Sequence, residues 1–152
     1  MACAEREWHE LPAMIIGCAL RANGWDTTVL GAATSPMRLS QHLADSGPDA
    51  VAISCSVLGA LPTTRRFIEA ATAAGVPTLV GGPAFGYDNV RAHALGATAW
   101  ASDAYAAVLT MEALPTIAPL PCRRSCRRPP ASRPSSTCIT AESSRRCATG
   151  GH

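Results

Sequence analysis

The sequence of 152 residues contains no lysine, and only 5% of its residues are aromatic. No apolar run reaches the roughly 18 residues that a membrane-spanning helix requires. The first residues, Met-Ala-Cys-Ala-Glu-Arg-Glu, lack the apolar stretch of a secretory signal. These absences lead us to expect a cytoplasmic protein with no membrane partner.

The seven cysteines do not predict a disulfide framework, because their number is odd. Three of them fall within strand-like or helix-like patterns, where a free cysteine behaves as a small apolar side chain: Cys3, Cys18 and Cys55. The other four, together with His152, suggest zinc as a minor alternative. The spacing of Cys122 and Cys126 misses the usual two-residue gap of a zinc site.

Positive charge is concentrated near the C-terminus. Residues 121–152 hold seven arginines and one acid, a net charge of about +6, whereas residues 1–120 hold six arginines and ten acids, about −4. From residue 115 onward Pro, Ser, Arg and Cys dominate, and a segment without apolar periodicity cannot offset its ordering entropy. We expect residues 115–152 to be a disordered tail, and the abrupt change is consistent with a non-native, frame-shifted C-terminus.

Nucleic-acid binding through this arginine run is a weak alternative. Charge alone can attract a phosphate backbone. However, no aromatic residues interleave with the arginines, and no DNA-reading helix is evident.

Residues 1–114 alternate strand and helix patterns at short spacing, which is typical of a parallel α/β sheet. The patterns predict strands at residues 1–4, 25–30, 50–54, 76–80 and 97–101. They predict helices at residues 11–23, 37–46, 61–74, 89–95 and 103–114. The first strand is shorter than the usual 5–6 residues, so we expect a truncated first strand that weakens the domain.

Three predicted strand ends carry different chemical groups. The first is followed by Glu7-Trp8-His9-Glu10-Leu11-Pro12, the third by Ser54-Cys55-Ser56 and the fourth by Gly81-Gly82. In an open α/β sheet, ligands bind outside the carboxyl ends of the strands. An imidazole, two hydroxyls and a bare backbone therefore describe one site.

In this order and spacing the residues resemble the cobalamin-binding domain family. Its pattern is Asp-x-His-x-x-Gly, then Ser-x-Leu or a Ser-rich equivalent, then Gly-Gly. The resemblance covers about residues 2–112. It implies a flavodoxin-like, Rossmann-like sheet of five parallel strands with helices on both faces, and a first strand that lies centrally. It also implies cobalamin, a cobalt corrinoid, as the cofactor.

The resemblance further implies a role for each residue of the motif. His9 would be the metal ligand on the lower face of cobalt, and Glu7 can hold its other ring nitrogen. The displaced nucleotide tail would run into the domain beside the remaining cofactor-binding residues, Leu11, Ser54, Ser56, Gly81 and Gly82. Taken alone, each of these residues has a plainer interpretation, such as a surface histidine, a buried strand end or an ordinary turn.

The sequence departs from the family pattern at four positions. Glu7 replaces Asp, Pro12 replaces Gly, and Arg6 stands where the subgroup often has Gly. Ala60 occupies the place of a serine that completes a proton relay in some members, which puts that relay in doubt.

The leading interpretation is a cobalamin-binding module without catalysis of its own, a fragment of a regulator or sensor. An upstream helical or DNA-binding module would be its partner. The alternatives are a corrinoid carrier subunit of a methyltransferase system and a remnant that no longer binds cobalamin. A dinucleotide site lacks its Gly-x-Gly-x-x-Gly, Glu7 and Glu10 would repel a flavin phosphate, and a phospho-receiver domain needs a lysine.

Overall fold

The computed structural model describes residues 1–115, and the structural statements below concern these residues. The elements are β1 (Ala2–Cys3), α1 (Glu10–Ala22), α2 (Pro36–Ser46), β2 (Val51–Ser54), η1 (Leu58–Ala60), α3 (Leu61–Ala73), β3 (Thr78–Gly81), η2 (Pro83–Phe85), α4 (Val90–Ala94), β4 (Ala99–Ala101) and α5 (Ala104–Glu112). The predicted tail, the zinc alternative and the arginine run lie outside the described residues.

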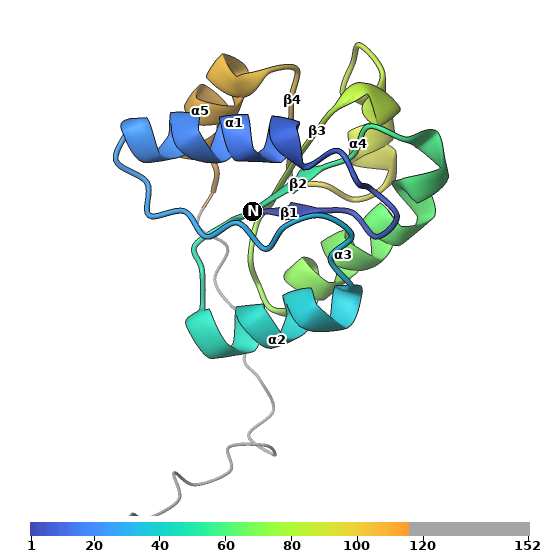
Figure 1. Cartoon of the computed structure of the whole chain (residues 1–152), viewed down its shortest axis with the longest axis horizontal. Coiled ribbons are helices and arrows are strands. Elements are labelled where there is room, and N and C mark those ends of the chain that lie inside the picture. The colour runs from blue at the N-terminus through green and yellow to red at the C-terminus, as the bar shows by residue number, and fades with distance from the viewer. Residues whose placement is uncertain (116–152) are drawn as a thin grey trace, which may run out of the picture. The chain divides into compact units, whose positions relative to one another are not determined.

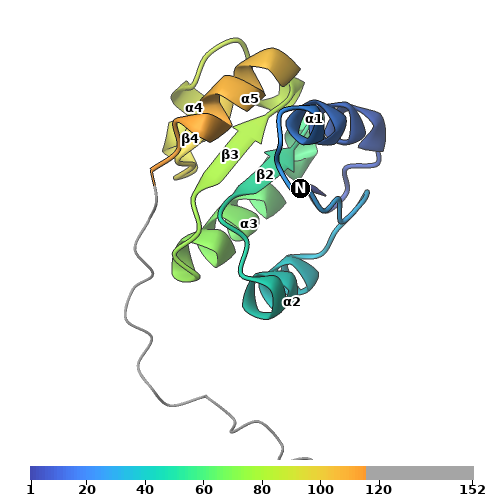
Figure 2. The ribbon, with the colours of Figure 1, turned by 90° about the vertical axis from the view of Figure 1, so that its left-hand side faces the viewer.

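The strands form one parallel sheet in the order β1-β2-β3-β4. Helices α1 and α5 cover one face of the sheet, and α2 and α3 cover the other (Figures 1 and 2). This three-layer arrangement confirms the predicted flavodoxin-like α/β fold. Within the described residues, no helix has the length and apolar character needed to cross a membrane.

Each face of the sheet has its own buried core. On the α2 and α3 face, the core includes Leu39, Leu43, Ile53, Phe67, Ile68 and Val80. On the α1 and α5 face, it includes Leu20, Ala52, Leu79, Val108 and Met111. Successive residues of β2 therefore contribute to opposite cores, as the alternation of side chains along a strand requires.

The predicted helices all form, and their ends lie within two residues of the predicted ones. Local signals set these ends. The Ser35 side chain accepts a hydrogen bond from the Arg38 N–H at the start of α2, and Gly47 ends that helix in the left-handed region at φ 55°. Asp103 caps α5 by accepting from the Ala106 N–H.

The strand predicted at residues 25–30 does not form, so the sheet has four strands and not five. Residues 28–31 nevertheless run beside β1. The Leu30 N–H donates to the Met1 carbonyl at 2.8 Å, and the Cys3 N–H donates to the Gly31 carbonyl at 3.3 Å. The physical reason is a shift of one residue in the pairing, because a parallel ladder would direct the Cys3 N–H to the Leu30 carbonyl and it donates to the Gly31 carbonyl instead. The assigned sheet consequently has β1 at its edge and not at its centre.

Candidate cofactor-binding site

The site is built around the carboxylate of Glu7, which is fully buried. Its Oε1 accepts a hydrogen bond from the His9 backbone N–H at 2.9 Å and lies 2.6 Å from His9 Nδ1. Its Oε2 accepts from the backbone N–H groups of Ser56 and Val57. One carboxylate therefore ties the loop after β1 to the loop after β2.

The surroundings of Glu7 keep it ionised. Burial raises the pKa of Glu7, but the hydrogen bonds from His9, Ser56 and Val57 outweigh burial and hold the pKa below its usual value. An ionised carboxylate can only accept, so Nδ1 of His9 carries a proton, and in the neutral form of the ring the lone pair is then on Nε2. The His9 side chain is 67% exposed, which leaves this lone pair accessible.

A cavity of about 280 Å³ opens between α1, α5 and the sheet. Four residues predicted from the sequence line this cavity: Leu11, Ser54, Gly81 and Gly82. The other three predicted residues, Glu7, His9 and Ser56, meet in the hydrogen-bonded group at the loop ends. The structure thus brings the predicted residues together in two sets. The two sets adjoin, because Leu11, which lines the cavity, follows His9 by two residues.

Part of the cavity wall was not predicted. Helix α5 contributes Ala104 and Ala107, strand β4 contributes Ala101, and α1 contributes Ile15 and Ile16. Ala104 and Ala107 are three residues apart, a spacing that places both small side chains toward one face of α5. This spacing was the sequence signal for the wall.

The glycine pair has a structural reason that is independent of any ligand. A Cβ atom on Gly81 would lie 2.9 Å from the carbonyl oxygen of Ala101 in β4. A Cβ atom on Gly82 would overlap the carbonyl oxygen of Cys55, and Gly82 also has a φ of +111°. Room for a nucleotide tail is therefore an incomplete explanation of Gly81-Gly82, because close backbone approach already requires both glycines.

The residues that depart from the family pattern fit the backbone and the contacts at their own positions. Pro12 lies in the first turn of α1, where a backbone N–H has no partner within the helix and its loss costs little. Arg6 has a φ of 70°, in the left-handed region that favours glycine. The longer side chain of Glu7 reaches both loops.

The buried cysteines are not candidates for ligands or nucleophiles. Burial raises the pKa of the Cys3 thiol to about 11, and burial likewise raises the pKa of Cys55. Both thiols therefore stay protonated near neutral pH. Across residues 1–115, no cluster of three or more His, Cys, Asp or Glu side chains is placed to hold a metal ion.

Comparisons with known proteins identify the family of this chain. The family model of the B12 binding domain matches residues 1–109, so the chain belongs to this family and its cofactor is cobalamin. No curated protein matches the chain.

Among the solved structures that share the fold are the following three, and each similarity covers 74% of this chain. A novel cobalamin-binding protein from Desulfitobacterium hafniense DCB-2 is 20% identical, with a TM-score of 0.68. The monomethylamine corrinoid protein of Methanosarcina barkeri is 19% identical, with a TM-score of 0.63. The methanol:cobalamin methyltransferase complex MtaBC of the same organism is 22% identical, with a TM-score of 0.65. The similarity covers 56%, 56% and 43% of these chains, respectively.

Replacing Glu7 with Gln should destabilise the domain at pH 7 by about 1–3 kcal/mol, because an amide leaves buried N–H donors without acceptors. The pKa of Glu7 is lowered on folding, so its contribution is complete above the unfolded-state pKa and is lost as the pH falls through the folded-state pKa. Urea unfolding between pH 7 and pH 3 should therefore show the two proteins converging.

Glu69→Gln is the matched control, because Glu69 is exposed and pairs only with Arg65 along the same helix. It should cost less than about 0.5 kcal/mol at any pH. A stability gap between Glu7→Gln and the parent that stays constant down to pH 3 would show that Glu7 is not an ionised acceptor.

Gly82→Ala should be more destabilising than Gly24→Ala. Both glycines have positive φ, which costs an alanine about 1–2 kcal/mol. Only at Gly82 does the added Cβ meet backbone, which adds about 1–3 kcal/mol for overpacking. Equal unfolding free energies for the two variants would contradict the close approach of Gly82 to Cys55.

Proposed function

We propose that the domain holds cobalamin with Nε2 of His9 as the lower axial ligand of cobalt. The observation that carries this proposal is the contact of 2.6 Å between His9 Nδ1 and the buried Glu7 carboxylate, on a ring that is otherwise exposed. Histidines that bind metals commonly give their other ring N–H to a carboxylate, which fixes the tautomer and raises the basicity of the ligand.

The donor set fits a corrinoid cobalt. A neutral imidazole suits a metal ion of borderline softness, and the corrin ring supplies the equatorial nitrogens, so one protein ligand is enough. When bound, cobalamin supplies a cobalt centre able to carry an alkyl group. The chain's own contribution is to orient His9 through Glu7, whose second oxygen is fixed by the amides of Ser56 and Val57.

The cavity between α1 and α5 receives the nucleotide tail in this proposal. Its walls are largely apolar, which suits an aromatic base, and the nearly buried Ser54 offers a hydroxyl to a ring nitrogen. Trp8 is 76% exposed next to His9 and would border the corrin. Leu11 lies at the start of α1, between the histidine and the cavity.

Within a larger protein, the domain would have one of two roles. The leading proposal is a module of a regulator or sensor that pairs with an upstream helical or DNA-binding module. The similarity to a corrinoid protein and to a methyltransferase complex favours the alternative, a corrinoid carrier for a partner methyltransferase. Methyl transfer from the methylcobalamin-loaded protein to a partner methyltransferase would decide for the carrier.

Mixing the protein with hydroxocobalamin, followed by gel filtration and a visible spectrum, tests the ligand. The parent should retain the corrinoid with the spectrum of a histidine-bound, base-off form. His9→Ala should lose that spectrum and bind at least about 10–100-fold more weakly, because losing even a hydrogen-bond partner behind a metal ligand costs that much affinity. His93→Ala, an exposed histidine on α4, is the control and should match the parent. An unchanged spectrum for His9→Ala would refute the assignment.

Filling the cavity tests the tail. Ala104→Leu should weaken cobalamin binding by about 10–200-fold, the range for a misfit of hydrophobic groups in a pocket. Binding of a tail-less corrinoid should be unaffected. Ala22→Leu makes the same change at an exposed position of α1 outside the cavity and should bind both like the parent. Equal losses for the two corrinoids in Ala104→Leu would contradict a tail cavity.

A further inference from the structure

The two helical layers of the domain differ in the composition of their outer sides. The charged residues on α2 and α3 are all exposed: Arg38, Asp45, Arg65, Arg66 and Glu69. In the layer of α1 and α5, by contrast, residues 11–20 and residues 104–111 contain no charged residue. Helices that are apolar on all sides are usually buried, so the composition of α1 and α5 is unusual for helices that face water.

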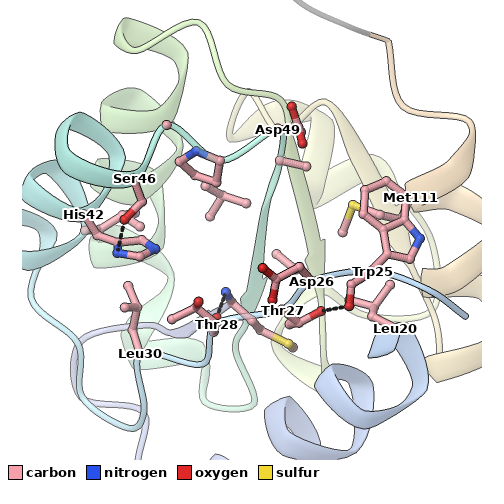
Figure 3. A pocket seen from close by; sticks show the side chains of 17 residues that line it. Leu20, Trp25, Asp26, Thr27, Thr28, Leu30, His42, Ser46, Asp49 and Met111 are labelled. Carbon is pink, nitrogen blue, oxygen red and sulfur yellow. Dashed lines mark hydrogen bonds between the residues drawn. The ribbon is translucent and has the colours of Figure 1, made fainter. Parts of the chain in front are cut away.

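The inner sides of α1 and α5 already have partners. Leu20 of α1 and Met111 of α5 belong to the core on this face of the sheet, and both line a second cavity near the start of β2 (Figure 3). The buried residues of the two helices are Ala13, Gly17 and Leu20 on α1 and Ala107, Val108 and Met111 on α5. The opposite side of each helix is exposed in the part of the chain that the structure describes.

Apolar side chains occupy this exposed side. They are Leu11, Met14, Ile15 and Cys18 on α1 and Tyr105 and Leu109 on α5, which together we call the α1–α5 outer surface. Tyr105 is 76% exposed, Leu109 50% and Met14 49%. Leu11 and Ile15 also line the cavity proposed for the nucleotide tail, but the other four residues do not. The cofactor site therefore does not account for the exposure of those four.

The absence of charge determines which kind of partner can cover the α1–α5 outer surface. A basic segment or a nucleic acid would lose the hydration of its own charges there without gaining an ion pair. The complement of an uncharged apolar surface is another uncharged apolar surface. A second copy of this chain presents one of the same size and composition.

The size of the surface suits a weak contact between two copies. Helix α1 has 13 residues and α5 has 9. At about 1.5 Å per residue and a width of about 10–12 Å, the two helices present a footprint of about 400 Å² per copy. Such a contact would bury on the order of 1,000 Å² of accessible surface in total, the lower limit for a specific interface. We therefore expect a Kd on the order of 10 µM.

We propose that the α1–α5 outer surface is the contact between two copies of this chain in a homodimer. Both copies contribute the same surface, so the contact is closed by a two-fold axis. Removal of apolar side chains from water stabilises it. The neighbouring charged residues Arg21, Asp103 and Glu112 lie at the ends of the two helices, where they stay in water. This proposal does not depend on cobalamin.

Sedimentation velocity of the full chain tests the contact, in a reducing buffer and without cobalamin. The concentration runs from about 1 to about 300 µM, a range on both sides of the expected Kd. The parent is compared with Met14→Glu on α1 and Leu109→Glu on α5. Met37→Glu is the matched control, because Met37 is 79% exposed on α2, in the other layer. Amide NMR shifts of the parent at low and high concentration locate the contact without any substitution.

The parent should change from monomer to dimer across this range, with concentration-dependent shifts concentrated on α1 and α5. Met14→Glu and Leu109→Glu should each weaken dimerisation at least about tenfold, because a two-fold contact carries each added charge twice. Met37→Glu should dimerise like the parent. A parent that stays monomeric at the highest concentration, a dimer that survives both substitutions on α1 and α5, or an equal loss in Met37→Glu would overturn the proposal. Shifts concentrated on α2 and α3 would also overturn it.

Discussion

The hydrogen bonds of the Glu7 carboxylate are the interaction on which the site depends. A buried carboxylate is stable only when its oxygens are satisfied, and here the backbone amides of two loops and one imidazole satisfy them. The same contacts that make burial tolerable also fix the loop after β1 against the loop after β2. The orientation of His9 is thus a consequence of how the sheet end is closed, and the fold would preorganise this ring for the proposed role as a ligand.

The second part of the site, the cavity between α1 and α5, depends on the close approach of backbone segments at Gly81 and Gly82. Gly82 allows the loop after β3 to pass next to Cys55, and Gly81 allows β3 to lie against Ala101 of β4. These contacts hold the strand ends together below the cavity between α1 and α5. Substitutions at the glycines therefore change the fold first, which makes Ala104 on α5 a better position for testing the proposal that the cavity receives the nucleotide tail.

Local sequence signals were sufficient for the helices, whereas the contact between Glu7 and His9 was expected from the resemblance to the cobalamin-binding family. Ser35, Gly47 and Asp103 mark helix ends through bonds within a few residues, so the sequence nearby determines them. The missing strand at residues 25–30 could not be predicted in this way, because its formation depends on its register with β1, a partner that is distant in the sequence. Likewise, the reason for Gly82 lies in Cys55, which is far away in the sequence.

The central claim is that Nε2 of His9 coordinates cobalt while Glu7 holds Nδ1. The most direct measurement is electron paramagnetic resonance of the protein loaded with cobalamin and reduced to the cobalt(II) form, with histidine labelled with nitrogen-15. An axial nitrogen from His9 predicts that each cobalt line changes from a triplet to a doublet on labelling, and that His9→Ala abolishes this change. Triplets that persist in the labelled protein would show that the axial nitrogen belongs to the cofactor's own base, and would contradict the account.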